Sequence, residues 1–145
     1  MAKIVDGGEL PNWPDASGVY IFWCASPGES EHRLGAILYV GVSGLLRRRI
    51  SYALGVEGQG VPHGAQGPLL EFQKSGGVAR VFICPIRQDV NEGDLEDALL
   101  SEYQHRVGRL PAWNKEGPGK SPVSDAARSL VSSILDTLNV RTSLP

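Results

Sequence analysis

The sequence predicts an α+β protein in which helices flank a small, mainly antiparallel three-stranded sheet. Three aromatic or β-branched segments bounded by glycine, proline or polar residues are typical of strands: 18–24, 35–42 and 78–86. Three further segments carry apolar residues at the helical spacing: 45–54, 94–107 and 121–138. The order strand–strand–helix–strand–helix–helix indicates this fold class.

The first two strands are expected to pair as an antiparallel hairpin, because a polar loop containing Pro27-Gly28 separates them. The helix that follows has a buried stripe defined by Leu46 and Ile50. The glycine- and proline-rich segment 55–68 predicts a long irregular loop, which in compact domains is often functional. A short helical turn over 69–73 leads into the third strand.

The second long helix is expected to begin at the polar run 91–94 and to stop before Pro111. Pro122 suits the first turn of the last helix. We expect that helix to pack against the sheet, with a dimer contact as the alternative.

With 145 residues the chain is long enough for one domain with a single core. Residues 1–16 show no clear period and predict a lead-in segment. The folded domain is expected over 17–115, and 116–145 are expected to form a linker and the C-terminal helix on the same domain.

Bulk composition is that of an ordinary globular protein, with 41% hydrophobic and 21% charged residues. No apolar run approaches the roughly 18 residues of a membrane span. Cys24 and Cys84 each lie in a strand-like segment, which favours reduced thiols and a cytoplasmic location, nucleoid-associated in a bacterium. The formal net charge of −2 means that any nucleic-acid binding needs locally concentrated basic charge.

Such a concentration occurs at Arg47, Arg48 and Arg49. On a helix whose core direction is set by Leu46 and Ile50, Arg48 points nearly opposite the core and Arg49 borders the apolar stripe. Arg49 is therefore placed to bind a phosphate with both ends of its guanidinium group. The alternative is a solvated basic face.

Glu96 falls within the apolar sector that Leu95, Leu99, Leu100 and Tyr103 define on their helix. A carboxylate in such a position is costly unless it is paired or holds a metal. The two interpretations are a buried ion pair with an arginine and a ligand for a hard cation such as Mg²⁺.

Tyr20 and Tyr39 are strand residues, and a strand tyrosine often simply fills the core. A phenol with a pKa of about 10 is a poor base at neutral pH unless cationic charge lies nearby.

Together these segments resemble the GIY-YIG nuclease family. GVY (18–20) and YVG (39–41) are similar to the two halves of its signature, and LLRRRI (45–50) is similar to its basic helix. LEDALLSEY (95–103) resembles its glutamate-bearing helix, and LPAWN (110–114) its closing segment. The resemblance covers about residues 17–114.

The resemblance implies a phosphodiesterase site built from five residues. Glu96 would bind one Mg²⁺ or Mn²⁺, and Tyr39 would position or deprotonate the attacking water with the help of Tyr20. Arg49 would neutralise charge on the scissile phosphate, and Asn114 would hold the site together by hydrogen bonds.

The chain departs from the family pattern at two positions and in a longer hairpin between Tyr20 and Tyr39. Many members have lysine where this chain has Val42, and several have histidine where it has Ala53. His63 is the candidate substitute for that histidine.

The sequence therefore predicts a divalent-metal-dependent endonuclease acting on DNA, with RNA left open as a substrate. Specificity would come from loops, particularly 55–68, from DNA structure or from a targeting protein. A homodimer is the other possible partner, and no membrane partner is expected. The alternative is a non-cleaving nucleic-acid-binding or regulatory module on the same fold.

Overall fold

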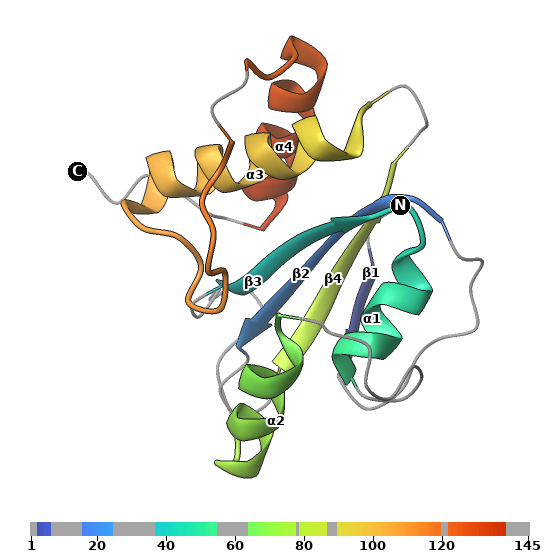
Figure 1. The fold of residues 1–145 in the computed structure, drawn as a ribbon, viewed down its shortest axis with the longest axis vertical. Coiled ribbons are helices and arrows are strands. Elements are labelled where there is room, and N and C mark those ends of the chain that lie inside the picture. The colour runs from blue at the N-terminus through green and yellow to red at the C-terminus, as the bar shows by residue number, and fades with distance from the viewer. Residues whose placement is uncertain are drawn as a thin grey trace.

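The protein has an α+β fold with an antiparallel sheet and four helices in its described part. The computed structural model describes residues 3–6, 16–24, 37–54, 64–77, 79–86, 90–119 and 122–138. The sheet order is β1-β4-β2-β3, with every neighbouring pair antiparallel (Figure 1). The predicted fold class, an α+β fold with a small antiparallel sheet flanked by helices, is confirmed.

The three predicted strands are β2 (Gly18–Cys24), β3 (Ile37–Ser43) and β4 (Ala79–Pro85). β2 is paired with both other strands, and its Tyr20 lies opposite Gly41 on β3 and Ile83 on β4. The predicted pairing of the first two strands is confirmed. The loop 25–36, with the predicted turn at Pro27-Gly28, lies outside the described residues.

A fourth strand, β1 (Lys3–Asp6), pairs with the outer side of β4 and occupies the edge of the sheet. The prediction of three strands, with no regular structure in 1–16, was wrong here. Four residues with one adjacent apolar pair carry too weak a pattern to predict a strand, and this one exists because β4 offers it an open edge.

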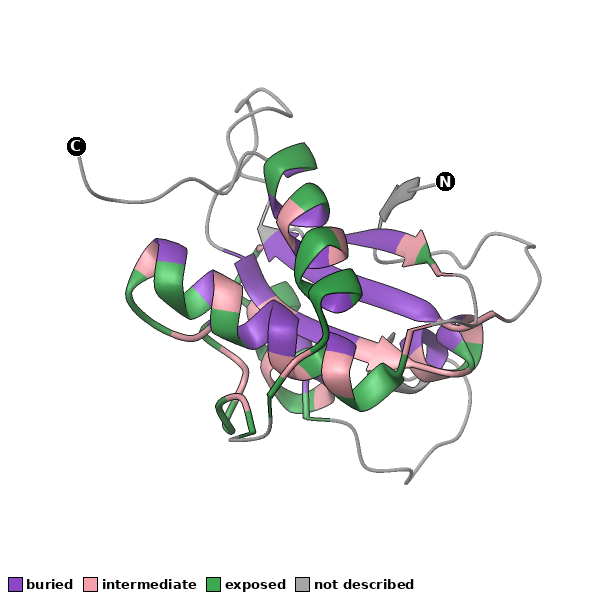
Figure 2. Ribbon diagram, turned by 90° about the horizontal axis from the view of Figure 1, so that it is seen from above, coloured by how far each residue is buried: buried purple, intermediate pink, exposed green. Residues whose placement is uncertain are grey.

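Helices cover both faces of the sheet. α1 (Leu46–Leu54) and α2 (Gln66–Lys74) share a core with Tyr20 and Phe22 of β2. α3 (Glu92–Val107) and α4 (Asp125–Thr137) share the other core with Val19, Ile21 and Trp23. Alternate residues of β2 therefore serve opposite layers, as the pleat of a strand requires. In Figure 2 the sheet is buried along most of its length, while the helices carry exposed residues on their outer sides.

α2 extends over nine residues, where the sequence predicted only a short helical turn at 69–73 after a long loop at 55–68. Gly67 and Pro68 were interpreted as loop residues. Both lie in the first turn, where proline is tolerated because the N–H that it lacks has no partner in the helix. Residues 55–63 of the predicted loop, including His63, lie outside the described residues.

Both helices of the second layer begin at side-chain caps. Asn91 Oδ1 accepts from Asp94 N at 3.1 Å, and Ser124 Oγ accepts from Ala127 N at 3.3 Å. The last helix therefore begins at Asp125, with Ser124 as its N-cap, later than the predicted start at Ser121-Pro122. α4 packs mainly on α3, and its apolar side chains join the core on that face of the sheet.

Arg106 ties these two helices together. It donates to Glu102 at 2.9 Å and to Asp136 at 2.8 Å, and Ser132 Oγ receives a further bond at 3.0 Å. The charge is thus paired where the two helices meet, which allows this arginine to be buried. α3, the helix that carries Glu96, is therefore held in place from its outer side.

Candidate functional site

The two predicted tyrosines meet on the α1–α2 face of the sheet. Their ring centroids are 6.0 Å apart, with 31° between the ring planes. Tyr20 is 1% exposed, and its hydroxyl group is hydrogen-bonded with the side chains of Tyr39 and Arg49. Residues from β2, β3 and α1 thus form one polar cluster at the border of an apolar core. We call Tyr20, Tyr39 and Arg49 the tyrosine–arginine cluster.

The environment of Tyr20 keeps its hydroxyl protonated. Burial raises the pKa of Tyr20 far above its usual range, and Tyr39 adds to the rise, while the nearby charge of Arg49 opposes it. Tyr20 is therefore a hydrogen-bond donor at neutral pH, which favours Tyr39 over Tyr20 as the group that acts on water.

Gly41 makes room for this tyrosine. It lies directly opposite Tyr20 across the β2–β3 pair, and the Tyr20 ring lies over its backbone. A Cβ atom at position 41 would lie 2.5 Å from the Tyr20 hydroxyl oxygen and would overlap the ring. The glycine of YVG thus has a local steric reason, because no side chain fits between the tyrosine and the strand.

A β-bulge lies next to Tyr39. Phe22 pairs with Tyr39 and Trp23 pairs with Ile37, so Leu38 is an extra residue on β3. Leu38 and Tyr39 both join the α1–α2 core, whereas Ile37 joins the opposite one. Strict alternation would have placed Ile37 and Tyr39 on the same face. Bulges commonly redirect side chains beside functional sites, and nothing in the sequence pattern indicates this one.

Asn114 closes the free edge of β3. Its Oδ1 accepts from Val40 N at 2.9 Å, and its Nδ2 donates to Val40 O at 3.0 Å. Trp113 N donates to Leu38 O at 2.8 Å and thus pairs the carbonyl group of the bulge. The segment 111–114 therefore satisfies backbone groups that an edge strand leaves open, on both sides of Tyr39. Asn114 acts here on the backbone of β3, and its predicted role in holding a catalytic site together stays a prediction.

Replacing Asn114 with alanine is expected to destabilise the fold by about 1–3 kcal/mol, because one substitution leaves both the N–H and the C=O of Val40 without a partner. Urea denaturation of Asn114→Ala measures the loss, with Gln104→Ala on the exposed side of α3 as the control. Equal stability of the two variants would contradict the role assigned to the Asn114 amide.

The basic run of α1 is arranged as its helical angles predict. Arg48 is exposed, whereas Arg47 and Arg49 are half-buried beside the buried Leu46 and Ile50. Arg48 and Arg49 line a groove of about 400 Å³ at the start of α1, together with residues 43–45. Two guanidinium groups beside the beginning of a helix favour an anion such as a phosphate.

Glu96 reaches the same region from α3. The N-terminus of α3 lies beside the start of α1, since Glu92 Oε1 would be 2.9 Å from a Cβ atom built on Gly44. The positive charge of Arg49 acts on Glu96 and opposes the rise in the pKa of this carboxyl group that its other surroundings cause. A carboxylate from one layer and a guanidinium group from the other therefore lie within electrostatic reach of each other.

The predicted burial of Glu96 was wrong, because its residue surface is exposed. Its helical angle lies among the apolar positions of α3, but a side chain is covered only where another element lies over it. The pKa of Glu96 is nevertheless raised, first because the protein displaces part of the water around the carboxyl group. Asp97 and Glu116 add to the rise.

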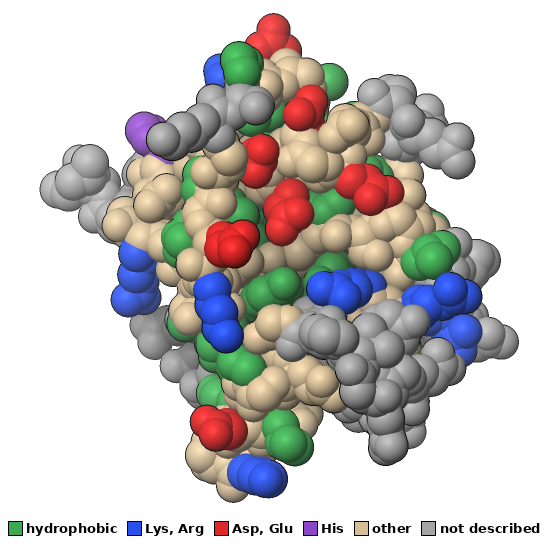
Figure 3. All heavy atoms as spheres, viewed as in Figure 1, with side chains coloured by type: hydrophobic (Ala, Val, Ile, Leu, Met, Phe, Trp, Pro, Cys, Tyr) green, Lys and Arg blue, Asp and Glu red, His purple; other side chains and the backbone are tan. Residues whose placement is uncertain are grey.

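Glu96, Asp97 and Glu116 make a region of negative charge opposite the basic groove. The Asp97 carboxylate accepts a hydrogen bond from the backbone N–H of Gly119 at 2.9 Å, and the charge of Arg49 acts on Glu96. Figure 3 shows acidic side chains gathered on the α3 side of this face, with some of the basic side chains toward α1.

Mg²⁺ fits this donor set. It is usually bound through one or two carboxylates, and waters and substrate phosphates complete its shell. Within the described residues, no three His, Cys, Asp or Glu side chains come together as a metal cluster. Glu96 would thus hold the cation as a single carboxylate, assisted by the negative charge around it.

The positions at which the chain departs from the family pattern do not add a side chain to the tyrosine–arginine cluster within the described residues. Val42 packs into the α3–α4 core, on the face opposite Tyr20 and Gly41. A side chain at position 42 therefore starts on the side of the sheet away from the tyrosines. The side chain of Ala53 and all of His63 lie outside the described residues.

None of the helices that the structure describes has the length and apolar character needed to cross a bilayer.

Neither models of known protein families, nor curated proteins, nor solved structures match this chain. A functional assignment therefore depends on the chemistry of the site.

Proposed function

We propose that the protein is a divalent-metal-dependent endonuclease that hydrolyses phosphodiester bonds in DNA, as the resemblance to GIY-YIG nucleases implies. One observation carries the proposal. Four polar side chains predicted from separate segments, those of Tyr20, Tyr39, Arg49 and Glu96, come within hydrogen-bonding or electrostatic reach of one another. The packing of a hydrophobic core alone does not require these four polar side chains to come together.

Arg49 supplies the positive charge that phosphoryl transfer needs. Its guanidinium group lies between the Tyr20 hydroxyl and the groove that opens at Arg48. A phosphate entering that groove would receive hydrogen bonds from arginine while negative charge builds on its oxygens. Because Arg49 is already held by Tyr20, little reorganisation is required when the substrate binds.

Glu96 would hold the Mg²⁺ or Mn²⁺ ion. When bound, the cation would stabilise negative charge on the phosphate oxygens and the leaving group. Glu96 and Arg49 lie within electrostatic reach of each other, so a cation held by Glu96 would lie near a phosphate bound by Arg49.

Tyr39 would orient the attacking water. Its ring is half-buried, whereas that of Tyr20 is fully buried, so Tyr39 is the tyrosine that a water molecule can approach. Tyr20 remains protonated and can donate to the Tyr39 oxygen, which fixes the direction of the Tyr39 hydroxyl group. The Asn114 amide and the backbone N–H of Trp113 hold β3 on both sides of Tyr39.

The test is a cleavage assay with labelled linear duplex, branched and single-stranded DNA, and with RNA, in the presence of Mg²⁺. Wild type is expected to cut at least one substrate, and Tyr39→Phe should cut it about 10²-fold more slowly, because water loses its oriented partner. Tyr103→Phe, in the opposite core, is the matched control and should keep near-wild-type activity. Absence of cleavage by wild type on all substrates would refute the proposal.

A non-cleaving nucleic-acid-binding module is the second candidate. It is favoured by the valine at position 42, where many members of the resembled family have a lysine. In that case Glu96 would serve as an electrostatic partner of Arg49. Tight binding of DNA without Mg²⁺-dependent cleavage would favour this candidate. A cytoplasmic location is part of either proposal.

A further inference from the structure

A second groove adjoins the tyrosine–arginine cluster. It has a volume of about 630 Å³ and is lined by Gly67, Pro68, Glu71, Phe72, Ser75 and Trp113. Pockets that hold small molecules or cofactors commonly measure 300–1,000 Å³. We call this the aromatic groove. None of the six lining residues is basic, in contrast to the groove at Arg48 and Arg49.

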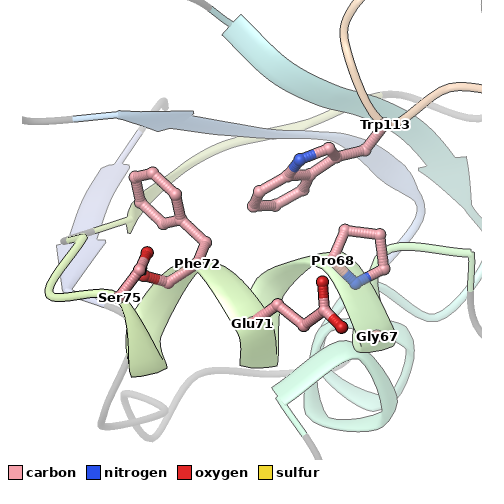
Figure 4. A pocket seen from close by; sticks show the side chains of 6 residues that line it. All are labelled: Gly67, Pro68, Glu71, Phe72, Ser75 and Trp113. Carbon is pink, nitrogen blue, oxygen red and sulfur yellow. The ribbon is translucent and has the colours of Figure 1, made fainter.

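Phe72 and Trp113 make one continuous wall of the aromatic groove. Their ring centroids are 5.8 Å apart, and the planes meet edge to face at 70°. Figure 4 shows Pro68 on the other side of the indole ring and the Glu71 carboxylate below it. Both rings are only half-buried, although they border the same core as Tyr39. Flat apolar rings left accessible in this way are suited to stack against another flat ring.

The wall is held rigidly. The Phe72 ring lies against the backbone of Gly77, where an added Cβ atom would come 2.7 Å from its Cδ1 atom. The backbone N–H of Trp113 is fixed on Leu38 O, the carbonyl group of the β-bulge. The residue that follows Trp113 clamps β3 beside Tyr39. The wall is therefore preorganised, and it is joined to the strand that carries Tyr39.

The start of α2 also connects the aromatic groove with the tyrosines. A Cβ atom on Gly64 would lie 3.8 Å from the Tyr39 hydroxyl oxygen. Three residues later Gly67 lines the aromatic groove. Two segments thus connect the aromatic groove with the surroundings of Tyr39. One is the start of α2, and the other is the segment 111–114.

Glu71 decides which part of a nucleic acid fits. A carboxylate repels phosphate, but it accepts hydrogen bonds from the amino and imino groups on the edge of a base. Guanine presents two adjacent donors, N1–H and N2–H, which match the two oxygens of one carboxylate. Aromatic stacking with a carboxylate at the base edge is complementary to an unpaired nucleobase.

We propose that the aromatic groove binds one unpaired nucleobase, preferably guanine, next to the phosphodiester held by Arg49. The proposal rests on the proposed function and adds a substrate class: nucleic acids with a single-stranded or displaced base beside the cut. Bases inside a duplex are already stacked and cannot enter such a groove without being displaced.

The test measures binding of labelled 12-nucleotide single strands by fluorescence anisotropy in EDTA, with the duplex of the same sequence alongside. Trp113→Ala and Phe72→Leu are expected to weaken single-strand binding about 5- to 100-fold, as for the loss of one stacked base. Duplex binding should change less than about twofold. Leu70→Ala, an exposed apolar residue of α2 outside the groove, is the matched control.

A second comparison changes an exposed residue, so its result does not depend on how the aromatic side chains pack. Glu71 is exposed, so Glu71→Gln should leave the melting temperature unchanged. Wild type should bind an oligothymidylate with one central guanine about fivefold more tightly than oligothymidylate alone, and Glu71→Gln should lose that preference. The same measurements with RNA strands show whether the protein distinguishes ribose from deoxyribose.

The outcomes separate this proposal from the proposed function. If wild type cleaves DNA and the groove variants bind single strands as wild type does, the endonuclease stands and the base site is overturned. If wild type does not cleave but Trp113→Ala and Phe72→Leu lose single-strand binding alone, the base site stands. Equal losses on single strands and duplex would overturn it.

Discussion

The Glu96→Gln variant is expected to cleave DNA about 10²- to 10³-fold more slowly than wild type, while melting at nearly the same temperature. Glutamine keeps the size and hydrogen-bonding capacity of the side chain but removes the charge that would hold Mg²⁺. Because Glu96 is exposed, its replacement should change stability by no more than about 0.5 kcal/mol. The two measurements are single-turnover cleavage and thermal melting.

Asp125→Asn is the matched control, an exposed carboxylate at the start of α4 changed to its amide. Mn²⁺ should raise the melting temperature of wild type and of Asp125→Asn, but not that of Glu96→Gln. Equal Mn²⁺ shifts in all three proteins would contradict a metal role for Glu96.

The Gly41→Ala variant is expected to be both less stable and less active than wild type. The new methyl group would overlap the Tyr20 ring, and overpacking of this kind costs about 1–3 kcal/mol. Tyr20 holds Tyr39 and Arg49, so its displacement should also disturb both. A shift of about 1 Å in catalytic groups can reduce a rate by about 10²-fold.

Gly67→Ala provides the comparison for this prediction, because a Cβ atom at position 67 meets no other atom within 4 Å. That variant should be neutral or slightly stabilised, since alanine favours a helix over glycine. Urea denaturation and cleavage rates are measured for both variants. A Gly41→Ala protein with wild-type stability would show that the contact between Tyr20 and Gly41 does not constrain the site.

Much of the fold follows from local patterns. The apolar residues of β2 and the stripe of Leu46 and Ile50 on α1 are dense enough to predict both elements. The same helical geometry correctly predicted that Arg48 is exposed and that Arg49 borders the core. These predictions succeeded because side-chain direction in a regular element depends on the residue's position in that element.

Other features depend on contacts between distant segments, and the sequence pattern does not contain them. The bulge at Leu38 is defined only by pairing with β2, and β1 exists only because β4 accepts it. Glu96 has the predicted helical angle, but its exposure depends on what lies over it. Trp113 was read only as part of a closing segment, although its half-buried ring beside Phe72 forms a groove wall.

Whether Tyr39, Arg49 and Glu96 act together in one site is tested most directly by a cycle of single and combined variants in the Mg²⁺-dependent cleavage assay. If all three serve one transition state, Tyr39→Phe combined with Glu96→Gln should be about as slow as the slower single variant. The same relation should hold for Arg49→Lys combined with Glu96→Gln. Rate losses that simply multiply, or a wild type that cuts no substrate, would contradict a shared phosphodiesterase site.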